Sequence, residues 1–128
     1  MKKSSFLYTA MAFLVMLLFS QCFYDTIVPD PIELPDEVSF QADILPIFNA
    51  SCNMSGCHNT GGIAPDLSEA NAFTSLIAGN YVVKTAPETS VLYQWMLGNE
   101  AINMPPSGPD ATYNALVLQW ITEGAFNN

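Results

Sequence analysis

The segment Cys52-Asn53-Met54-Ser55-Gly56-Cys57-His58 constrains the fold more than any other part of the 128-residue chain. It places two thiols and the only imidazole of the sequence within seven consecutive residues, after a stretch that reads as a helix. The pair Ser55-Gly56 is of the kind that lets a backbone turn tightly. The fold must therefore present one bulged loop in which two sulfur atoms and a histidine side chain can act together.

Three chemistries fit these residue types. Covalent attachment of a c-type haem uses two thiolates for thioether bonds and the imidazole that follows the second cysteine as an iron ligand. Its usual spacing has two residues between the cysteines, whereas this loop has four. A disulfide between Cys52 and Cys57 is the second interpretation. A metal site is the third, although a structural zinc site needs four ligands and the chain adds only Cys22 and no second histidine.

The first 22 residues have the plan of an export signal. Lys2 and Lys3 precede an uncharged stretch over residues 6–19, and Ser20-Gln21-Cys22 follows. This stretch is short for a membrane span and typical of the apolar part of a signal peptide. Cys22 resembles the acylation site of bacterial lipoproteins, although Gln21 stands where such signals usually carry a small residue. We expect export to the periplasmic side of a bacterial membrane with a lipid anchor at Cys22; simple secretion or an uncleaved anchor are the alternatives.

The charge of the chain excludes two classes of partner. Twelve carboxylates accompany three lysines and no arginine, and loss of residues 1–22 would leave Lys84 as the only cationic side chain. Nucleic acid and anionic lipid headgroups offer nothing to so negative a surface. We therefore expect no nucleic-acid binding, membrane contact through the N-terminal anchor only, and a basic protein as partner.

Composition divides the rest of the chain in two. Three prolines among acidic residues predict an extended tether over residues 23–37. Residues 38–128 read as a single all-α domain with long loops, because no alternating apolar and polar run is long enough for a sheet.

Helix signals in this domain are well spaced. The pattern predicts a first helix capped by Ser39 and kinked or divided by Pro46. It predicts a second helix from Ser68 to a left-handed turn at Gly79, and a third from residues 87–90 to Gly98. A fourth helix is expected between Asp110 and Gly124, with its apolar face made by Tyr113, Leu116, Val117, Trp120 and Ile121.

Met104 is a second candidate for chemistry. It lies in the proline-rich loop Asn103-Met104-Pro105-Pro106-Ser107-Gly108, where a methionine has no helix face to pack. A thioether there suits haem iron opposite a histidine, and a methionine that fills the core beside a turn is the alternative. Met54 lies too close to the cysteine loop to reach the opposite face, and Met96 lies on a predicted helix face.

In this order the motifs resemble a bacterial c-type cytochrome domain over about residues 38–126. The resemblance rests on a helix followed by C-x-x-x-x-C-H, Ala64-Pro65-Asp66-Leu67, a helix, Ser90-Val91-Leu92-Tyr93, Met104-Pro105-Pro106 and Trp120-Ile121-Thr122-Glu123-Gly124-Ala125. It implies a small helical fold around one covalent haem c, with thioether bonds at Cys52 and Cys57, His58 as proximal ligand and Met104 as distal ligand. It also implies that the last helix packs against the first.

Such ligation favours electron transfer over catalysis, because a six-coordinate iron has no open position for a substrate. We expect the haem to be buried among Ile44, Phe48, Leu67, Phe73 and Tyr93, with Trp95 and Tyr93 lining its pocket, and Trp120 to pack on Phe48. The expected partner is a basic redox protein or a membrane oxidoreductase complex, with exchange slowed by salt. The alternatives are a haem-free structural lipoprotein with a Cys52–Cys57 disulfide, and a five-coordinate haem enzyme or gas-binding protein.

Overall fold

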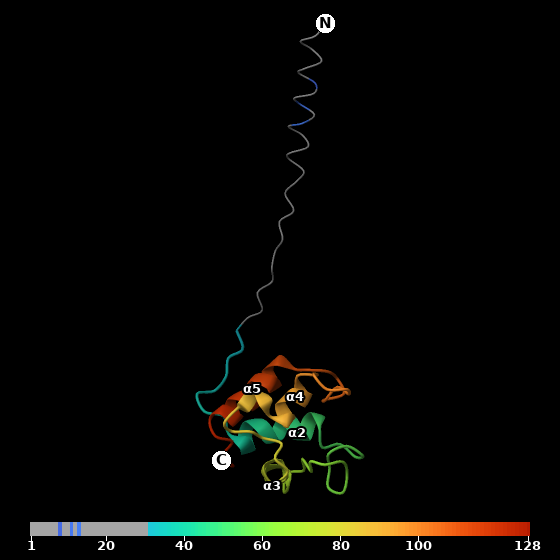
Figure 1. The fold of residues 1–128 in the computed structure, drawn as a ribbon, viewed down its shortest axis with the longest axis vertical. Helices are drawn as coiled ribbons and strands as arrows, with labels where there is room; N and C mark the ends of the chain where they lie inside the picture. Colours follow the sequence, from blue (N-terminus) through green and yellow to red (C-terminus); the bar gives the residue numbers. More distant parts are fainter. Residues whose placement is uncertain (1–7, 9–10, 12, 14–30) are drawn as a thin grey trace. The chain divides into compact units, whose positions relative to one another are not determined.

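The computed structural model describes Tyr8, Met11, Phe13 and residues 31–128. The predicted export signal over residues 1–22, including Cys22, and most of the predicted tether lie outside the described residues. Residues 32–128 group into one unit of helices and long loops (Figure 1). None of the helices in the described part of the chain is both long enough and apolar enough to cross a membrane.

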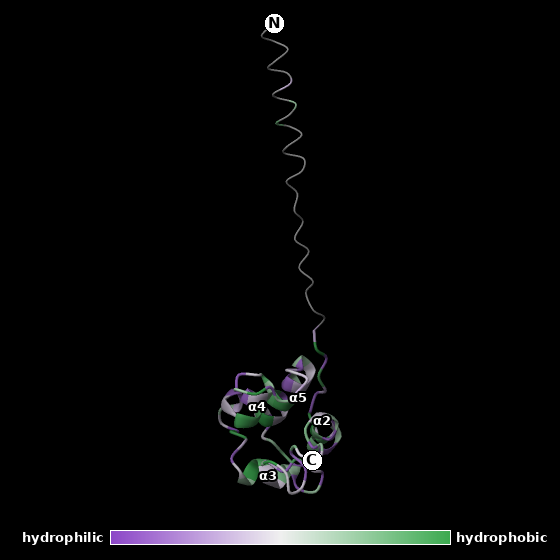
Figure 2. Cartoon of the chain, turned by 90° about the vertical axis from the view of Figure 1, so that its right-hand side faces the viewer, coloured by the Kyte–Doolittle hydropathy of each residue, from purple (hydrophilic) through white to green (hydrophobic). Residues whose placement is uncertain are grey.

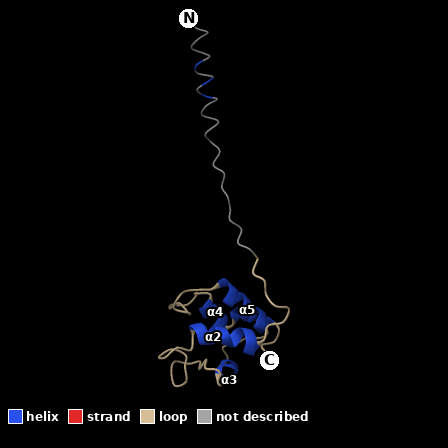
Figure 3. Ribbon diagram, turned by 180° about the vertical axis from the view of Figure 1, so that it is seen from behind, coloured by secondary structure: helices blue, strands red, loops and turns tan. Residues whose placement is uncertain are grey.

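The elements of this unit are all helical, and residues 31–128 contain no strand (Figure 3). The predicted all-α class is therefore confirmed for this part of the chain. In chain order the elements are the π-helix η1 (Phe40–Ile44), α2 (Leu45–Ser51), α3 (Ala72–Ala78), the 3₁₀-helix η2 (Pro87–Thr89), α4 (Val91–Met96) and α5 (Ala111–Thr122).

The first helix begins and divides as predicted. The Ser39 hydroxyl accepts a hydrogen bond from the backbone N–H of Ala42 at 3.2 Å. The first turn is a π-helix that ends at Ile44, and the α-helix α2 starts at Leu45 with Pro46 in its first turn. Proline has no N–H to donate to the carbonyl one turn earlier, so the α-helical ladder cannot continue back through this point.

The second helix is shorter than predicted. The Ser68 hydroxyl donates to the Asp66 carboxylate at 2.6 Å instead of capping a helix, and α3 begins only at Ala72. The predicted left-handed turn at Gly79 is wrong by one residue, because Gly79 has φ −81° and Asn80 has φ 58°. Asparagine tolerates the left-handed conformation, so the chain could reverse at Asn80 without a glycine.

The last two α-helices end where the sequence predicts. Gly98, after α4, has φ 74°, and Gly124, after α5, has φ 115°. Both values lie in the left-handed region that glycine enters without steric cost. The Asp110 carboxylate caps α5 by accepting from the Tyr113 N–H at 2.9 Å.

Phe40 is the centre of the hydrophobic core. Its ring centroid lies 5.1 Å from that of Trp120 on α5 and 5.3 Å from that of Phe73 on α3. The expected packing of the last helix on the first is confirmed, since α5 contacts η1. The aromatic partner of Trp120 is Phe40, whereas the Phe48 ring lies 6.3 Å from that of Phe40. Hydrophobic stretches, green in Figure 2, run through α3, α4 and α5.

Hydrogen bonds join both ends of this unit. The Val38 N–H donates to the Glu123 carboxylate at 2.9 Å, and the Phe40 N–H donates to Asn128 Oδ1 at 2.9 Å. The Gln119 side chain donates to the carbonyl of Pro35 at 2.9 Å, so the last residues of the predicted tether contact α5. These bonds hold the first helix beside α5. The long loops lie outside this contact and build the candidate site.

Candidate functional site

The candidate site is a cavity of about 330 Å³ between the cysteine loop, α4 and the loop that follows α4. Cys52, Cys57, His58 and Met104 all line it, so the structure brings the four predicted ligand residues together around one space. The two loops, green and orange in Figure 1, extend on the same side of the unit. The size of the cavity falls in the range of small-molecule and cofactor sites.

The wall of the cavity is apolar. No aspartate, glutamate, lysine or arginine is among its lining residues. Leu67 and Pro65 are buried at its floor, and Trp95 of α4 lies half-buried along it. Such a wall suits a largely hydrophobic ligand or cofactor.

The cysteine loop closes on itself directly after α2. The N–H of Cys52 still bonds to the carbonyl of Phe48 at 2.9 Å, so this residue continues the helix by one step. The His58 N–H then donates back to the carbonyl of Cys52 at 3.1 Å. The sequence predicts a tight turn at Ser55-Gly56, and Gly56, at φ 82°, adopts the left-handed conformation there. The four-residue spacer is accommodated by this turn.

The two cysteines are free thiols in the structure. Burial, with a smaller contribution from the neighbouring Cys57, raises the pKa of the Cys52 thiol to about 11. At neutral pH Cys52 is therefore a protonated thiol in an apolar setting. A thiol of this kind is a weak nucleophile until its surroundings or a bound group change its ionisation.

His58 is oriented by the backbone that follows it. Its Nδ1 atom lies 3.1 Å from the carbonyl oxygen of Ile63 and 3.1 Å from that of Pro65. Carbonyl oxygens only accept hydrogen bonds, so these contacts place the proton on Nδ1. The Leu67 N–H donates to the carbonyl of His58 at 2.7 Å and fixes the same segment. In the neutral ring the Nε2 atom is then the nitrogen with a free lone pair, which is the form that binds a metal.

Two methionines line the cavity where the sequence singled out one. Met104 is half-buried in its loop, and Met96 on α4 is 4% exposed. Met96 lies on a helix face, as predicted, and that face of α4 also forms part of the cavity wall, which the sequence analysis did not foresee. Leu92 and Met96 are four residues apart, so they share one side of the helix. This spacing is the sequence signal that could have identified Met96 as a cavity residue.

The other residues expected around the haem divide into two groups. Leu67 and Trp95 line the cavity as predicted, whereas Ile44 and Phe48 belong to the hydrophobic core. Tyr81 takes the place expected for Tyr93. Phe73, also expected there, packs against the core beside Phe40.

Within the described residues, no three histidine, cysteine, aspartate or glutamate side chains are grouped so that they could hold a metal ion. No known protein family, no curated protein and no solved structure matches the chain. The cavity and its side chains therefore provide the grounds for a function.

Proposed function

We propose that this protein is a monohaem c-type cytochrome that carries single electrons, with one haem c covalently bound in the cavity. The observation that carries the proposal is His58, whose Nδ1 is held by two backbone carbonyls inside an apolar cavity that Cys52, Cys57 and Met104 also line. A ligating histidine commonly donates its second ring N–H to a carbonyl or carboxylate, which fixes the ring and the tautomer.

The residues of the cavity fit such a group. Cys52 and Cys57 would hold it through thioether bonds, and His58 Nε2 and Met104 Sδ would be its axial ligands. When bound, the haem supplies an iron that alternates between the ferric and ferrous states and so exchanges one electron. The apolar wall and a thioether ligand both favour the ferrous form, so we expect a positive reduction potential.

The protein residues themselves have three tasks in this proposal. The carbonyls of Ile63 and Pro65 orient His58, and the wall that includes Leu67 and Trp95 excludes water from the site. With both His58 and Met104 bound to the group, no position would be open to a substrate, so the protein is proposed as a carrier and not as an enzyme. Its proposed location is the periplasmic side of a bacterial membrane, anchored through Cys22, with a basic redox protein or membrane oxidoreductase complex as partner.

The test is mass spectrometry and an absorption spectrum on protein made where haem maturation operates. We expect a mass gain of one haem that survives denaturation, together with the band typical of a methionine-ligated ferric haem. Cys57→Ser should reduce attachment to a single bond, and the double variant with Cys52→Ser should abolish it. A haem-free protein two hydrogens lighter than the reduced chain would mean a disulfide, and the structural lipoprotein would replace this proposal.

A further inference from the structure

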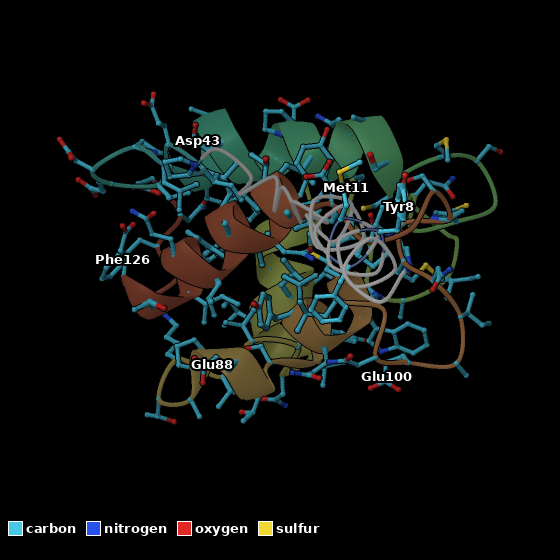
Figure 4. All side chains as sticks on the ribbon, turned by 90° about the horizontal axis from the view of Figure 1, so that it is seen from above. Tyr8, Met11, Asp43, Glu88, Glu100 and Phe126 are labelled. Atoms are coloured by element: carbon cyan, nitrogen blue, oxygen red, sulfur yellow. The ribbon has the colours of Figure 1, made fainter. Side chains whose placement is uncertain are left out.

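A second cavity, of about 320 Å³, lies between the segment that precedes η1 and the residues at the end of α5 and beyond it. We call it the second cleft, and its lining residues are Asp36, Glu37, Val38, Trp120, Glu123, Phe126 and Asn128. It shares no lining residue with the candidate site. In Figure 4, Phe126 lies at one edge of the unit, and Glu100, which precedes the loop that carries Met104, lies at the opposite edge. The second cleft is therefore a separate feature of the fold.

The floor of the second cleft is apolar and held in place. Val38 and Trp120 are each 1% exposed and belong to the hydrophobic core. The Trp120 Nε1–H donates to the carbonyl of Phe126 at 2.9 Å, which fixes the backbone of Phe126 beside the indole. The side chain of Phe126 is nonetheless 61% exposed. The cleft thus offers aliphatic and aromatic surface to a ligand without a rearrangement of the core.

The rim of the second cleft is acidic, with carboxylates from Asp36, Glu37 and Glu123. The Glu123 carboxylate accepts from the Val38 N–H at 2.9 Å and from the Gln119 side chain at 2.7 Å. Glu37 accepts only a long bond, 3.4 Å from Asn128 Nδ2. In the described part of the chain nothing donates a hydrogen bond to the Asp36 carboxylate. Asp36 and Glu37 therefore keep most of their capacity to accept hydrogen bonds from a ligand.

No cationic side chain lines the second cleft. Lys84 is the one lysine of residues 31–128, and these residues contain no arginine. Its Nζ atom lies 3.4 Å from the carbonyl oxygen of Ala125 and 5.7 Å from the centroid of the Phe126 ring. The ring of Phe126 therefore already attracts a cation from outside the cleft. The counter-charge for Asp36 and Glu37 must come from another molecule.

We propose that the second cleft is a docking site for an arginine side chain carried by an extended segment of a partner protein. A guanidinium group has five N–H donors in a planar fork, so it can donate to Asp36 and Glu37 together. Its aliphatic stem can lie on the apolar floor, and its plane suits the exposed ring of Phe126. The inference does not depend on the proposed function, and a partner bound here leaves the candidate site open.

Titration of the full chain, kept reduced, with a short acetylated and amidated glycine peptide that contains one arginine tests the proposal. Nuclear magnetic resonance reports on it through the indole N–H signals, because Trp120 lines the second cleft and Trp95, the other tryptophan, lines the candidate site. We expect the Trp120 signal to shift with a Kd on the order of 1 mM and the Trp95 signal to stay in place. A peptide with citrulline, an uncharged analogue of arginine, should bind at least about tenfold more weakly.

A double variant tests the rim. Asp36→Asn combined with Glu37→Gln keeps the shape of two exposed side chains and removes both charges, so it should weaken binding about fivefold. The matched control combines Glu88→Gln with Glu100→Gln, which removes the same net charge from exposed residues outside the cleft. It should change the Kd by less than about twofold, because salt screens distant charges. If the first double variant fails to fold, Asp36→Asn alone repeats the test.

Each outcome decides for or against the docking site. A shift of Trp120 alone, with selective weakening by the rim variant and loss of affinity for the citrulline peptide, supports it. Equal weakening by the two double variants would mean a general attraction to an acidic surface and would overturn it. A shift of Trp95 in place of Trp120, no shift of either signal, or equal binding of the citrulline peptide would overturn it as well. None of these results depends on whether the chain carries haem.

Discussion

The Nδ1 atom of His58 and the carbonyl oxygen of Pro65 lie 3.1 Å apart across a turn of seven residues. This contact connects the end of the cysteine loop to the segment that leads into α3. The ring is thereby fixed before any ligand binds, so no side-chain entropy needs to be lost at the moment of binding. Preorganisation of this kind is what the proposed role of His58 as a ligand needs.

Replacing Met104 tests the distal ligand. Under the proposed function, Met104→Ala removes one iron ligand, so the reduced haem-loaded protein should bind carbon monoxide, which the wild type should not. The reduction potential should also fall, because a thioether stabilises the ferrous state. Carbon monoxide binding is read from the absorption spectrum, and the potential from a redox titration.

Met96→Leu is the matched control for this experiment, since Met96 lines the same cavity and leucine has a similar volume. It should leave carbon monoxide binding absent and change stability by less than about 1.5 kcal/mol. If carbon monoxide instead binds to Met96→Leu and not to Met104→Ala, the distal ligand is Met96.

The Cys52 thiol should react slowly in the haem-free protein. With its pKa raised to about 11 from the ordinary 9.0, the thiolate fraction at pH 8 is about a hundredfold below that of an unfolded chain. A variant in which Cys22 and Cys57 are serine keeps the burial of Cys52, which is the larger cause, so its alkylation should keep accelerating above pH 9. Steric shielding of the thiol alone would lower the alkylation rate without moving the midpoint of its pH dependence. A midpoint near pH 9 in the folded protein would therefore contradict the raised pKa of Cys52.

The same thiol makes the stability of the haem-free protein depend on pH. Between about pH 9 and 11 the folded thiol keeps its proton while the unfolded thiol loses it, so the free energy of unfolding should fall as pH rises. At about 1.4 kcal/mol per pKa unit, the loss should reach at most about 3 kcal/mol. Urea denaturation in the presence of a reductant measures it, and Cys52→Ala should flatten the curve over this window.

The hydrogen bond from the Phe40 N–H to Asn128 Oδ1 should contribute to stability. Phe40 is fully buried, so Asn128→Ala leaves its N–H without a partner and should cost about 1 to 2 kcal/mol. Asn127→Ala removes only the exposed bond from Gln41 and should cost less than about 0.5 kcal/mol. Thermal or urea unfolding of the two variants compares them, and equal losses would show that the buried bond adds nothing.

Asp66 should stabilise the start of α3 as an ionised group. The side chain and backbone of Ser68 and the side chain of Asn71 donate to its carboxylate, and these bonds lower the pKa of Asp66. Its contribution is present above the ordinary pKa of a carboxyl and is lost as pH falls through the lowered value. Asp66→Asn should therefore be less stable than the wild type at pH 7, and the difference should shrink in acid.

Local signals in the sequence account for much of the fold. Ser39, Pro46, Gly98 and Asp110 act where capping and backbone rules place them, because each rule depends only on a few neighbouring residues. The left-handed turn after α3 falls at Asn80 and not at Gly79, which shows the limit of these local rules. Either residue can take a left-handed turn, and the hydrogen bonds of the helix end decide between them.

The site is harder to predict because it depends on contacts between distant segments. The cysteine loop and Met104 are visible as motifs, and the structure places them around one cavity. Whether Met96 and Tyr81 line the cavity depends on the rotation of α4 relative to the preceding loop. Sequence periodicity alone does not determine that rotation. The partner of Trp120 is likewise settled by the position of Phe40 in three dimensions.

In the closed cysteine loop, the length of the spacer and the positions of the two flanking cysteines are separate properties, although sequence motifs usually treat them as one. Met54, Ser55 and Gly56 are exposed, and the bond from His58 to Cys52 closes the loop beneath them. Extra spacer residues project into solvent and need not push the flanking sulfur atoms apart. The spacer can thus be long while Cys52, Cys57 and His58 still line one cavity, so a search that demands two residues between the cysteines would overlook this loop.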